Sequence, residues 1–270
     1  MTGGTSGIGK ETVLGLAKAG FCVVMAVRNL KKGEETIAEI SKQTNNTDLH
    51  LLECDLGSFA SIVKMTKAFQ EKYGRIDVLI NNAGIWEMTR KLTEDGLERN
   101  FAINHLAPFL ITNRLLDLIK KNPEARIISL ASSAHRFGKI YFDDLEGEKK
   151  YGGFRSYGQS KLANILFIKK LDQILQGSGV TANALHPGVV ATNLFDKMGS
   201  FLKGLFNMMM ISAAKGARTS IYLATSEEVK GVSGKYFYKC KIKTPSSAAR
   251  DMAVADALWI TSLGYVNKWL

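Results

Sequence analysis

Short runs of apolar and β-branched residues alternate with longer stretches of helical pattern along most of this 270-residue chain. The apolar runs predict strands at residues 21–27, 49–53, 77–81, 125–131, 180–185 and 235–238. The patterns between them predict helices at residues 7–19, 31–44, 58–73, 93–119, 156–176, 213–225 and 246–262. Strands that are apolar almost throughout and separated by helices are typical of a parallel sheet covered on both faces. We therefore expect an α/β fold with a doubly wound parallel sheet.

No linker, low-complexity stretch or internal repeat divides the chain, so residues 1–270 are expected to form a single domain. Hydrophobic residues make up 46% and charged residues 23%, which is globular composition. No apolar run approaches the length of a membrane span. Residues 1–4 lack the basic and apolar regions of a signal peptide. The sequence therefore predicts neither a single-pass membrane protein nor a secreted precursor.

The three cysteines, Cys22, Cys54 and Cys240, are odd in number, far apart and in no CxxC pair. The four histidines have no ligand-like spacing among themselves or with cysteine. We therefore expect neither a disulfide scaffold nor a metal site. The same cysteine usage predicts a reducing compartment. This places the chain in the cytoplasm or at a cytosol-facing membrane surface.

The chain carries a formal net charge of +11, from 36 basic and 25 acidic residues. These charges are spread out rather than gathered in a stripe, so no nucleic-acid partner is expected. The densest basic cluster is Lys235, Lys239, Lys241 and Lys243. It is either a solvated face or a surface attracted to anionic membranes or phosphorylated ligands, and peripheral membrane contact stays open.

Only Met1 and Thr2 precede the first glycine, Gly3. A doubly wound sheet normally opens with a central strand before such a glycine loop. We therefore expect the first strand to be truncated, and an N-terminal anchor would have been lost with it.

The glycine loop itself contains Gly3, Gly7 and Gly9 and runs directly into a helical pattern. Such glycines allow a tight turn and close backbone approach to a pyrophosphate, and the helix start offers amide groups to it. The spacing is GxxxGxG rather than GxGxxG, so the loop alone is either a simple turn or a dinucleotide site. In a Rossmann-like fold, the candidate contacts are Gly3, Thr5, Ser6, Gly7, Ile8 and Gly9.

Arg28 ends the predicted strand that follows this helix. An acidic residue at that place would bind the ribose hydroxyls of NAD, whereas a cation accommodates the 2′-phosphate of NADP. The sequence therefore favours NADP(H) as the cofactor.

With these residues, the whole chain resembles the short-chain dehydrogenase/reductase family. The glycine loop is similar to that family's TGxxxGIG motif, and Asp55, with Leu56 beside it, matches its adenine-contacting Asp. Asn82, Ala83 and Gly84 belong to a stretch that matches the NNAG motif. Further cofactor contacts implied by the resemblance are Pro187, Gly188, Val190 and Thr192, with Tyr157 and Lys161 contributing as well.

The same resemblance implies a catalytic tetrad of Asn104, Ser132, Tyr157 and Lys161. Ser133 stands next to Ser132, and we choose Ser132 because it holds the family's second serine position when residues 126–128 are matched to the family strand. Tyr157 and Lys161 lie one helical turn apart on the same face, so the ammonium would lower the phenol pKa and make Tyr157 a usable acid or base. By its pattern alone, Tyr157 could equally be a packed aromatic residue.

Residues 126–138, 160–164 and 231–237 resemble the retinol dehydrogenase subgroup, which acts on lipophilic alcohols and carbonyls. Residues 194–211 are rich in Met and Phe and are expected to be a substrate lid, an ordinary buried helix or a membrane-dipping segment. We therefore expect an NADP-dependent oxidoreductase acting on a lipophilic small molecule. The alternative is a non-catalytic dinucleotide-binding sensor or scaffold, and the sequence predicts no oligomeric state.

Overall fold

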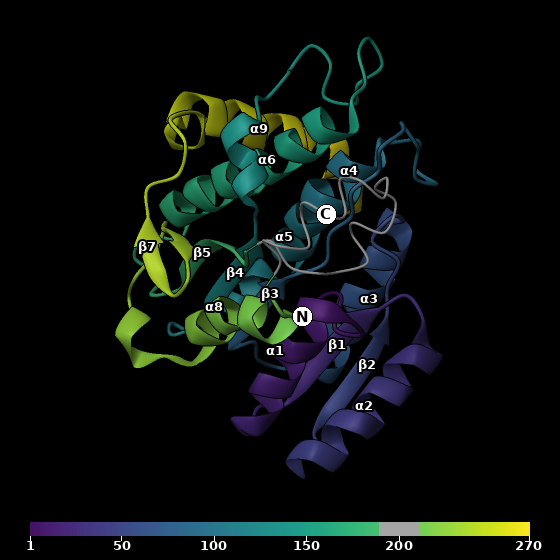
Figure 1. The fold of residues 1–270 in the computed structure, drawn as a ribbon, viewed down its shortest axis with the longest axis vertical. Coiled ribbons are helices and arrows are strands. Elements are labelled where there is room, and N and C mark those ends of the chain that lie inside the picture. Colours follow the sequence, from purple (N-terminus) through teal and green to yellow (C-terminus); the bar gives the residue numbers. More distant parts are fainter. Residues whose placement is uncertain (189–210) are drawn as a thin grey trace.

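The computed structural model describes residues 1–188 and 211–270 and shows a sheet flanked by helices on both faces (Figure 1). Its parallel strands are β1 (Val23–Val27), β2 (Leu49–Glu53), β3 (Val78–Asn81), β4 (Arg126–Leu130), β5 (Thr181–His186) and β6 (Tyr236–Tyr238). A short antiparallel strand, β7 (Lys241–Lys243), follows at the edge. The strands form two hydrogen-bonded groups, β1-β2 and β3-β4-β5-β6-β7.

Residues 1–3 lie between the two groups and connect them. On the β1 side, the Met1 amine donates to the Val24 carbonyl at 2.7 Å, and Ala26 N donates to the Met1 carbonyl at 2.9 Å. On the β3 side, Thr2 N donates to the Ile80 carbonyl at 3.1 Å. In the described structure, residues 1–3 occupy the central position between β1 and β3 and continue into the glycine loop.

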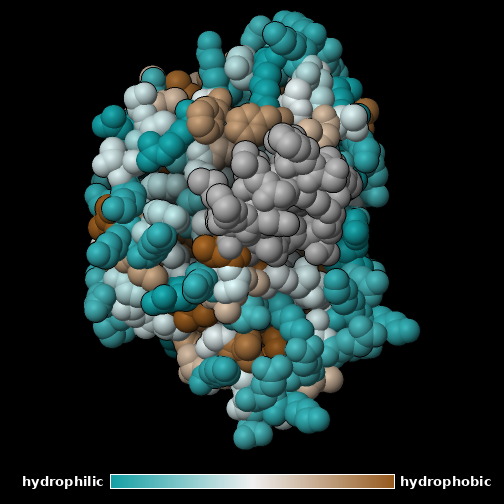
Figure 2. Space-filling view, in the orientation of Figure 1, coloured by the Kyte–Doolittle hydropathy of each residue, from teal (hydrophilic) through white to brown (hydrophobic). Residues whose placement is uncertain are grey.

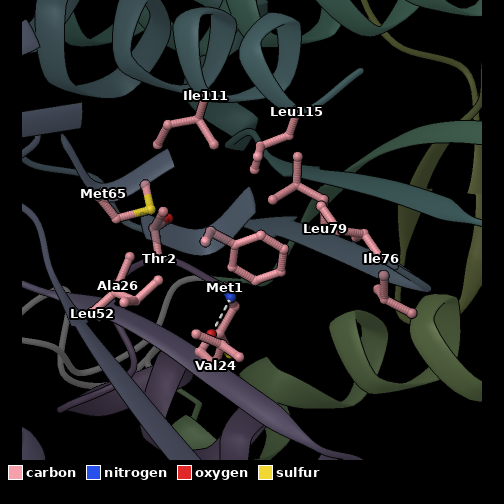
Figure 3. A pocket seen from close by; sticks show the side chains of 12 residues that line it. Met1, Thr2, Val24, Ala26, Leu52, Met65, Ile76, Leu79, Ile111 and Leu115 are labelled. Carbon is pink, nitrogen blue, oxygen red and sulfur yellow. Dashed lines mark hydrogen bonds between the residues drawn. The ribbon is translucent and has the colours of Figure 1, made fainter. Parts of the chain in front are cut away.

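Next to residues 1–3, β1 and β3 are separated by an apolar cavity of about 50 Å³ (Figure 3). Side chains from both strand groups and from two helices surround it, among them Val24, Leu79, Met65 and Ile111. The hydrogen bonds of residues 1–3 therefore hold β1 and β3 together beside this cavity.

The helices divide between the two faces of the sheet. One face is covered by α1 (Gly7–Lys18), α2 (Leu30–Thr44) and α8 (Ala213–Thr225), whose apolar side chains form one core cluster with β1. The other is covered by α3 (Phe59–Lys72), α5 (Ala107–Lys120), α6 (Gly153–Ile174) and α9 (Met252–Val266) around a larger cluster. This confirms the doubly wound α/β expectation.

The helix predicted at residues 93–119 is wrong at its start. The structure has α4 (Arg99–Phe101), then the π-helix η1 (Ala102–Leu106), then α5. The Glu98 carboxylate begins α4 by accepting from Asn100 N and Phe101 N, at 2.9 and 2.8 Å. Pro108 has no amide hydrogen and so cannot donate an α-helical bond to the carbonyl four residues back, which is consistent with the wider π turn before it.

The predicted helix at residues 246–262 is also divided. A short 3₁₀ turn, η5 (Ala248–Arg250), precedes α9, and Asp251 caps α9 by accepting from Val254 N at 3.1 Å. Strand β7 was not predicted, because its two lysines and exposed Ile242 make a polar pattern. Other short turns are η2 (Ser133–Phe137), η4 (Glu227–Val229) and η6 (Asn267–Trp269). None of the described helices is both long enough and apolar enough to span a membrane.

The buried histidine of the π-helix generates a prediction about acid stability. His105 packs between Phe101 and Phe109, and its Nε2 lies 2.8 Å from Ser262 Oγ. Burial lowers the His105 pKa from 6.5 to about 3. Between those values the unfolded chain binds the extra proton, so the free energy of unfolding falls as pH drops below 6.5, with a slope approaching about 1.4 kcal/mol per pH unit.

Urea unfolding between pH 7 and pH 4.5 measures this slope. His105→Gln keeps a polar side chain but removes the titrating group, so its free energy of unfolding should vary less with pH than that of the wild type. Equal slopes in the two proteins would show that His105 does not titrate in this way.

Candidate active site

A cavity of about 390 Å³ opens where the carboxyl ends of β3, β4 and β5 meet the start of α1. Openings at the carboxyl ends of parallel strands are the usual place for ligands in this type of sheet. The residues lining the cavity come from the glycine loop, the three strand ends and α6: Gly3, Ser6, Gly7, Ile8, Gly9, Asn82, Ala83, Gly84, Leu130, Ala131, Tyr157, Lys161 and Pro187.

The glycine loop requires glycine at several positions. Gly3 and Gly7 have φ values of +71° and +51°, which favour glycine. A Cβ at Gly9 would lie 1.9 Å from the Gly3 carbonyl oxygen, so the loop can close only without one. Ser6 precedes α1, and its side chain makes no capping hydrogen bond within the described structure. The first amide groups of α1 therefore remain available to an anion.

The segment after β3 holds the glycine loop in place through hydrogen bonds. The Asn82 side-chain amide donates to the carbonyls of Thr2 and Gly3, at 2.9 and 3.0 Å. In return, the Thr2 hydroxyl accepts from the backbone N–H groups of Asn82 and Ala83, both at 3.1 Å. Asn82 and Ala83 therefore fix the glycine loop as well as lining the cavity.

Arg28, Asp55 and Leu56 follow β1 and β2, at the same edge of the sheet but outside the lining of this cavity. Arg28 is exposed. The Asp55 carboxylate accepts from Gly57 N at 2.8 Å, while Asp55 N donates to Ser61 Oγ at 2.9 Å. The structure thus places Arg28, Asp55 and Leu56 just after the carboxyl ends of β1 and β2, at the same edge of the sheet as the cavity.

Lys161 and Gly84 line the cavity, and Asn104 lies close to both. The Asn104 side chain accepts from Ile85 N at 2.7 Å and donates to the Ile85 carbonyl and to Ser160 Oγ, both at 2.9 Å. Lys161 Nζ donates to the Leu130 carbonyl at 3.1 Å. A Cβ at Gly84 would lie 3.0 Å from Lys161 Nζ and 3.3 Å from Asn104 Oδ1, so a side chain there would crowd both groups.

Tyr157 also lines the cavity, and the centroid of its ring lies 5.7 Å from Lys161 Nζ. Ser132 ends the turn after β4, where its Oγ accepts from Ala134 N at 3.2 Å and also hydrogen-bonds Tyr157. Ser133 is the first residue of η2. The structure therefore brings Ser132 to the phenol.

Burial shifts both titrating groups at the site. It raises the pKa of Tyr157 to about 12, with the Ser132 hydrogen bond acting in the opposite direction. It lowers the pKa of Lys161 to about 8. The expected lowering of the phenol pKa is wrong for the chain by itself, because loss of hydration outweighs other effects and the Lys161 ammonium is directed at the Leu130 carbonyl.

The two histidines near the site have structural contacts. His135 Nδ1 lies 2.6 Å from the Ser132 carbonyl oxygen, and Nε2 accepts from Ser246 N at 3.2 Å. His186 stacks on Tyr238, with ring centroids 5.2 Å apart. Both therefore have structural contacts with neighbouring segments.

Pro187 lines the cavity, and Gly188 follows it with φ +101°. A Cβ at Gly188 would lie 2.6 Å from Ile211 Cδ1, so this turn packs closely against the start of the next described segment. Val190, Thr192 and nearly all of the proposed lid at 194–211 lie outside the described residues.

Sequence reasoning missed Glu98, which joins the helix carrying Asn104 to the helix carrying Tyr157. Glu98 is fully buried. Besides capping α4, its carboxylate accepts from Ser156 Oγ at 2.8 Å and from Tyr151 Oη at 3.1 Å. An acidic residue directly before a helical run was the available signal, but the contacts with 151 and 156 depend on the tertiary fold.

A cluster at the opposite end of the sheet was also missed. Cys22, Asp48 and His50 have potential ligand atoms within 4.8 Å of one another, because β1 pairs with β2 there. His50 Nε2 already lies 2.7 Å from Asp48 Oδ1, so an ion pair between these side chains accounts for the arrangement.

Comparison with known proteins agrees with this geometry. The short chain dehydrogenase family model matches residues 1–203. Retinol dehydrogenase 13 of Homo sapiens is 43% identical over 276 residues, covering 99% of this chain and 83% of the relative. Retinol dehydrogenase 12 of Mus musculus is 41% identical over 264 residues, covering 97% and 84%.

Solved structures show the same fold. An uncharacterized protein from Mycobacterium paratuberculosis superimposes with a TM-score of 0.80 at 32% identity, covering 98% of this chain and 91% of that one. The Pseudomonas aeruginosa RhlG/NADP active-site complex has a TM-score of 0.71 at 23% identity, covering 87% and 91%. With its glycine loop, its strand order and these relatives, the chain belongs to the short-chain dehydrogenase family of oxidoreductases and is related to the retinol dehydrogenases.

Proposed function

We propose that this chain is an NADP-dependent oxidoreductase that interconverts a lipophilic alcohol with its aldehyde or ketone. The observation that carries the proposal is that Tyr157 and Lys161 line one cavity together with the glycine loop. Ser132 hydrogen-bonds Tyr157, and Asn104 hydrogen-bonds Ser160, the neighbour of Lys161 in the chain. A non-catalytic sensor would need the loop but not this polar cluster beside it.

The residues present fit a dinucleotide. The free amide groups at the start of α1 suit the pyrophosphate, and Gly3, Gly7 and Gly9 line the cavity without side chains that would narrow it. Asn82, Ala83 and Gly84 would lie along the cofactor, as would Pro187 and Gly188. Lys161 would hydrogen-bond the nicotinamide ribose. When bound, the cofactor supplies or accepts the hydride.

Tyr157 is the proton donor in carbonyl reduction. With its pKa raised to about 12, the phenol stays protonated at neutral pH and can give its proton to the carbonyl oxygen. Ser132 donates a second hydrogen bond to the same oxygen, where negative charge develops. Lys161 stabilises the phenolate that remains, and Asn104 holds the water through which the phenolate regains a proton.

The choice of NADP rests on Arg28, and the lipophilic substrate on the relatives. Arg28 is exposed directly after β1, where its guanidinium can form a fork of hydrogen bonds with a 2′-phosphate. The curated relatives are named retinol dehydrogenases, and retinol is an apolar alcohol.

Tyr157→Phe tests the proton donor. Reduction of octanal with NADPH should fall by at least about 10²-fold in kcat, because the ring is kept and only the acidic proton is removed. NADPH binding, followed by fluorescence, should be nearly unchanged. Octanal should also be a better substrate than glyceraldehyde for the wild type. A variant with more than about a tenth of the wild-type kcat would place proton transfer elsewhere.

The adjacent serines provide a matched pair. Ser132→Ala should lower kcat for octanal reduction about 10-fold or more, because it removes a hydrogen bond to the developing oxyanion. Ser133→Ala removes the same atom one residue further along η2 and should keep kcat within about twofold, as for a surface change away from the chemistry. Steady-state kinetics of both variants decides between them, and the reverse order would assign the role to Ser133.

Arg28→Ala tests cofactor selection. Its Kd for NADPH should rise about 10-fold or more, through loss of hydrogen bonds to a charged phosphate worth about 1.5–3 kcal/mol. The Kd for NADH should change little. Arg75→Ala, which removes an exposed arginine paired with Asp77, serves as the control. Equal weakening of NADPH and NADH would mean that Arg28 contacts a part that both cofactors share.

A further inference from the structure

His135 is fully buried in η2, three residues after Ser132. Its ring Nδ1 lies 2.6 Å from the Ser132 carbonyl oxygen, and its ring Nε2 accepts from Ser246 N at 3.2 Å. Tyr236 of β6 packs edge-on against the ring, with centroids 5.0 Å apart. The imidazole is therefore held by its own turn, by β6 and by the segment that follows β7.

The two hydrogen bonds determine which ring nitrogen carries the proton. The Ser132 carbonyl oxygen can only accept, so Nδ1 must carry the proton, and the Ser246 backbone N–H can only donate, so Nε2 must lack one. Burial also lowers the pKa of His135 from its usual value of 6.5, which keeps the ring neutral at pH 7. His135 is thus in the Nδ1–H form, with both ring nitrogens paired.

Polar contacts hold residues 244–246 against η2. The preceding strand β7 is exposed at all of its residues, and Figure 2 shows mostly hydrophilic side chains on the side of the molecule where Figure 1 places β7. Little apolar surface of β7 is therefore buried. Besides the bond from Ser246 N to His135, Arg136 Nη2 donates to the Thr244 carbonyl at 3.2 Å. The His135 ring thus links η2 to this segment.

The Ser132 carbonyl is the part of the turn that His135 holds. It accepts from His135 twice, from the backbone N–H at 3.1 Å and from the ring. The hydroxyl of the same residue accepts from Ala134 N and hydrogen-bonds Tyr157. Because Cα joins the carbonyl to the side chain, a movement of the carbonyl also displaces the hydroxyl. A displacement of about 1 Å at a catalytic group can lower a rate about 100-fold.

We propose that His135 is a positioning residue for carbonyl reduction, whose Nδ1–H holds the Ser132 carbonyl so that the Ser132 hydroxyl stays beside Tyr157. This rests on the proposed function, because the hydroxyl must donate to the substrate oxygen. His135 acts through Ser132, since it is not among the residues that line the described cavity. The contact with Ser246 has a different role: it orients the ring and keeps the proton on Nδ1.

Two amide variants separate the two contacts of the ring. His135→Asn places an amide N–H where Nδ1 was and keeps the contact with Ser132, whereas His135→Gln reaches the Nε2 position and Ser246. For octanal reduction with NADPH, kcat should stay within about threefold in His135→Asn and fall about 10-fold or more in His135→Gln. The Tm should fall in both variants, because each loses one buried hydrogen bond. A purely structural residue would lower kcat equally in both, and that result would overturn the proposal.

A double variant tests whether the effect passes through the Ser132 hydroxyl. In a Ser132→Ala background, His135→Gln should lower kcat by less than about twofold, because the group that it misplaces is already absent. Arg136→Ala removes the other contact with residues 244–246 and should keep kcat within about twofold. The full loss in the Ser132→Ala background would overturn the proposal. So would a loss in Arg136→Ala as large as that in His135→Gln.

The position of the ring proton can be measured without turnover. Nitrogen-15 spectra of histidine rings distinguish Nδ1–H from Nε2–H, and His135→Asn identifies the His135 signals among those of the four histidines. The Nδ1–H form is expected at pH 7. Octanal reduction by a wild type whose His135 is in the Nε2–H or doubly protonated form would overturn this proposal alone. The Nδ1–H form in a wild type that reduces no octanal would contradict the proposed function instead.

Discussion

The hydrogen bonds of residues 1–3 join the two strand groups of the sheet, and the cofactor side of the molecule depends on them. Thr2 N and Gly3 N donate to strands on opposite sides, to Ile80 and Ala26. The Thr2 hydroxyl and the Asn82 amide then complete a network between the same two sides. Because the glycine loop begins at Gly3, its position relative to β3 is set by these few bonds, with an apolar cavity immediately beside them.

A second buried network fixes the other half of the site. Glu98 is fully buried, and its carboxylate accepts hydrogen bonds from the backbone amides of Asn100 and Phe101 and from the hydroxyls of Ser156 and Tyr151. Several donors are required to offset the cost of burying a carboxylate. The same bonds tie the start of α4 to α6, so one carboxylate links the segment that leads to Asn104 with the helix that carries Tyr157. Asn104 lies in the π-helix η1, which directly follows α4 and its Glu98 cap.

Much of the fold and of the candidate site could be predicted from patterns within short stretches of the sequence. The remainder depends on tertiary contacts. The alternation of strands and helices, the glycine loop and the Tyr157–Lys161 spacing are all visible within short stretches. The π-helix, the Glu98 contacts and the stacking of Trp86 on Tyr157 are not visible there, because each depends on segments far apart in the sequence. The direction of the Tyr157 pKa shift failed for the same reason: spacing revealed the nearby lysine, but only the folded structure shows how thoroughly the phenol is buried.

Exclusion of water connects the acid chemistry to substrate selection. Trp86 stacks on Tyr157, so it is one of the groups that keep water from the phenol and raise its pKa. In the reaction that we propose, an apolar substrate would remove further water from the site. The hydrogen bonds from Ser132 and Tyr157 to its carbonyl oxygen would then act in a medium of lower dielectric constant, where they stabilise developing charge more strongly. A small polar aldehyde would leave water beside the phenol and weaken this effect, so burial of the phenol bears on turnover as well as on affinity.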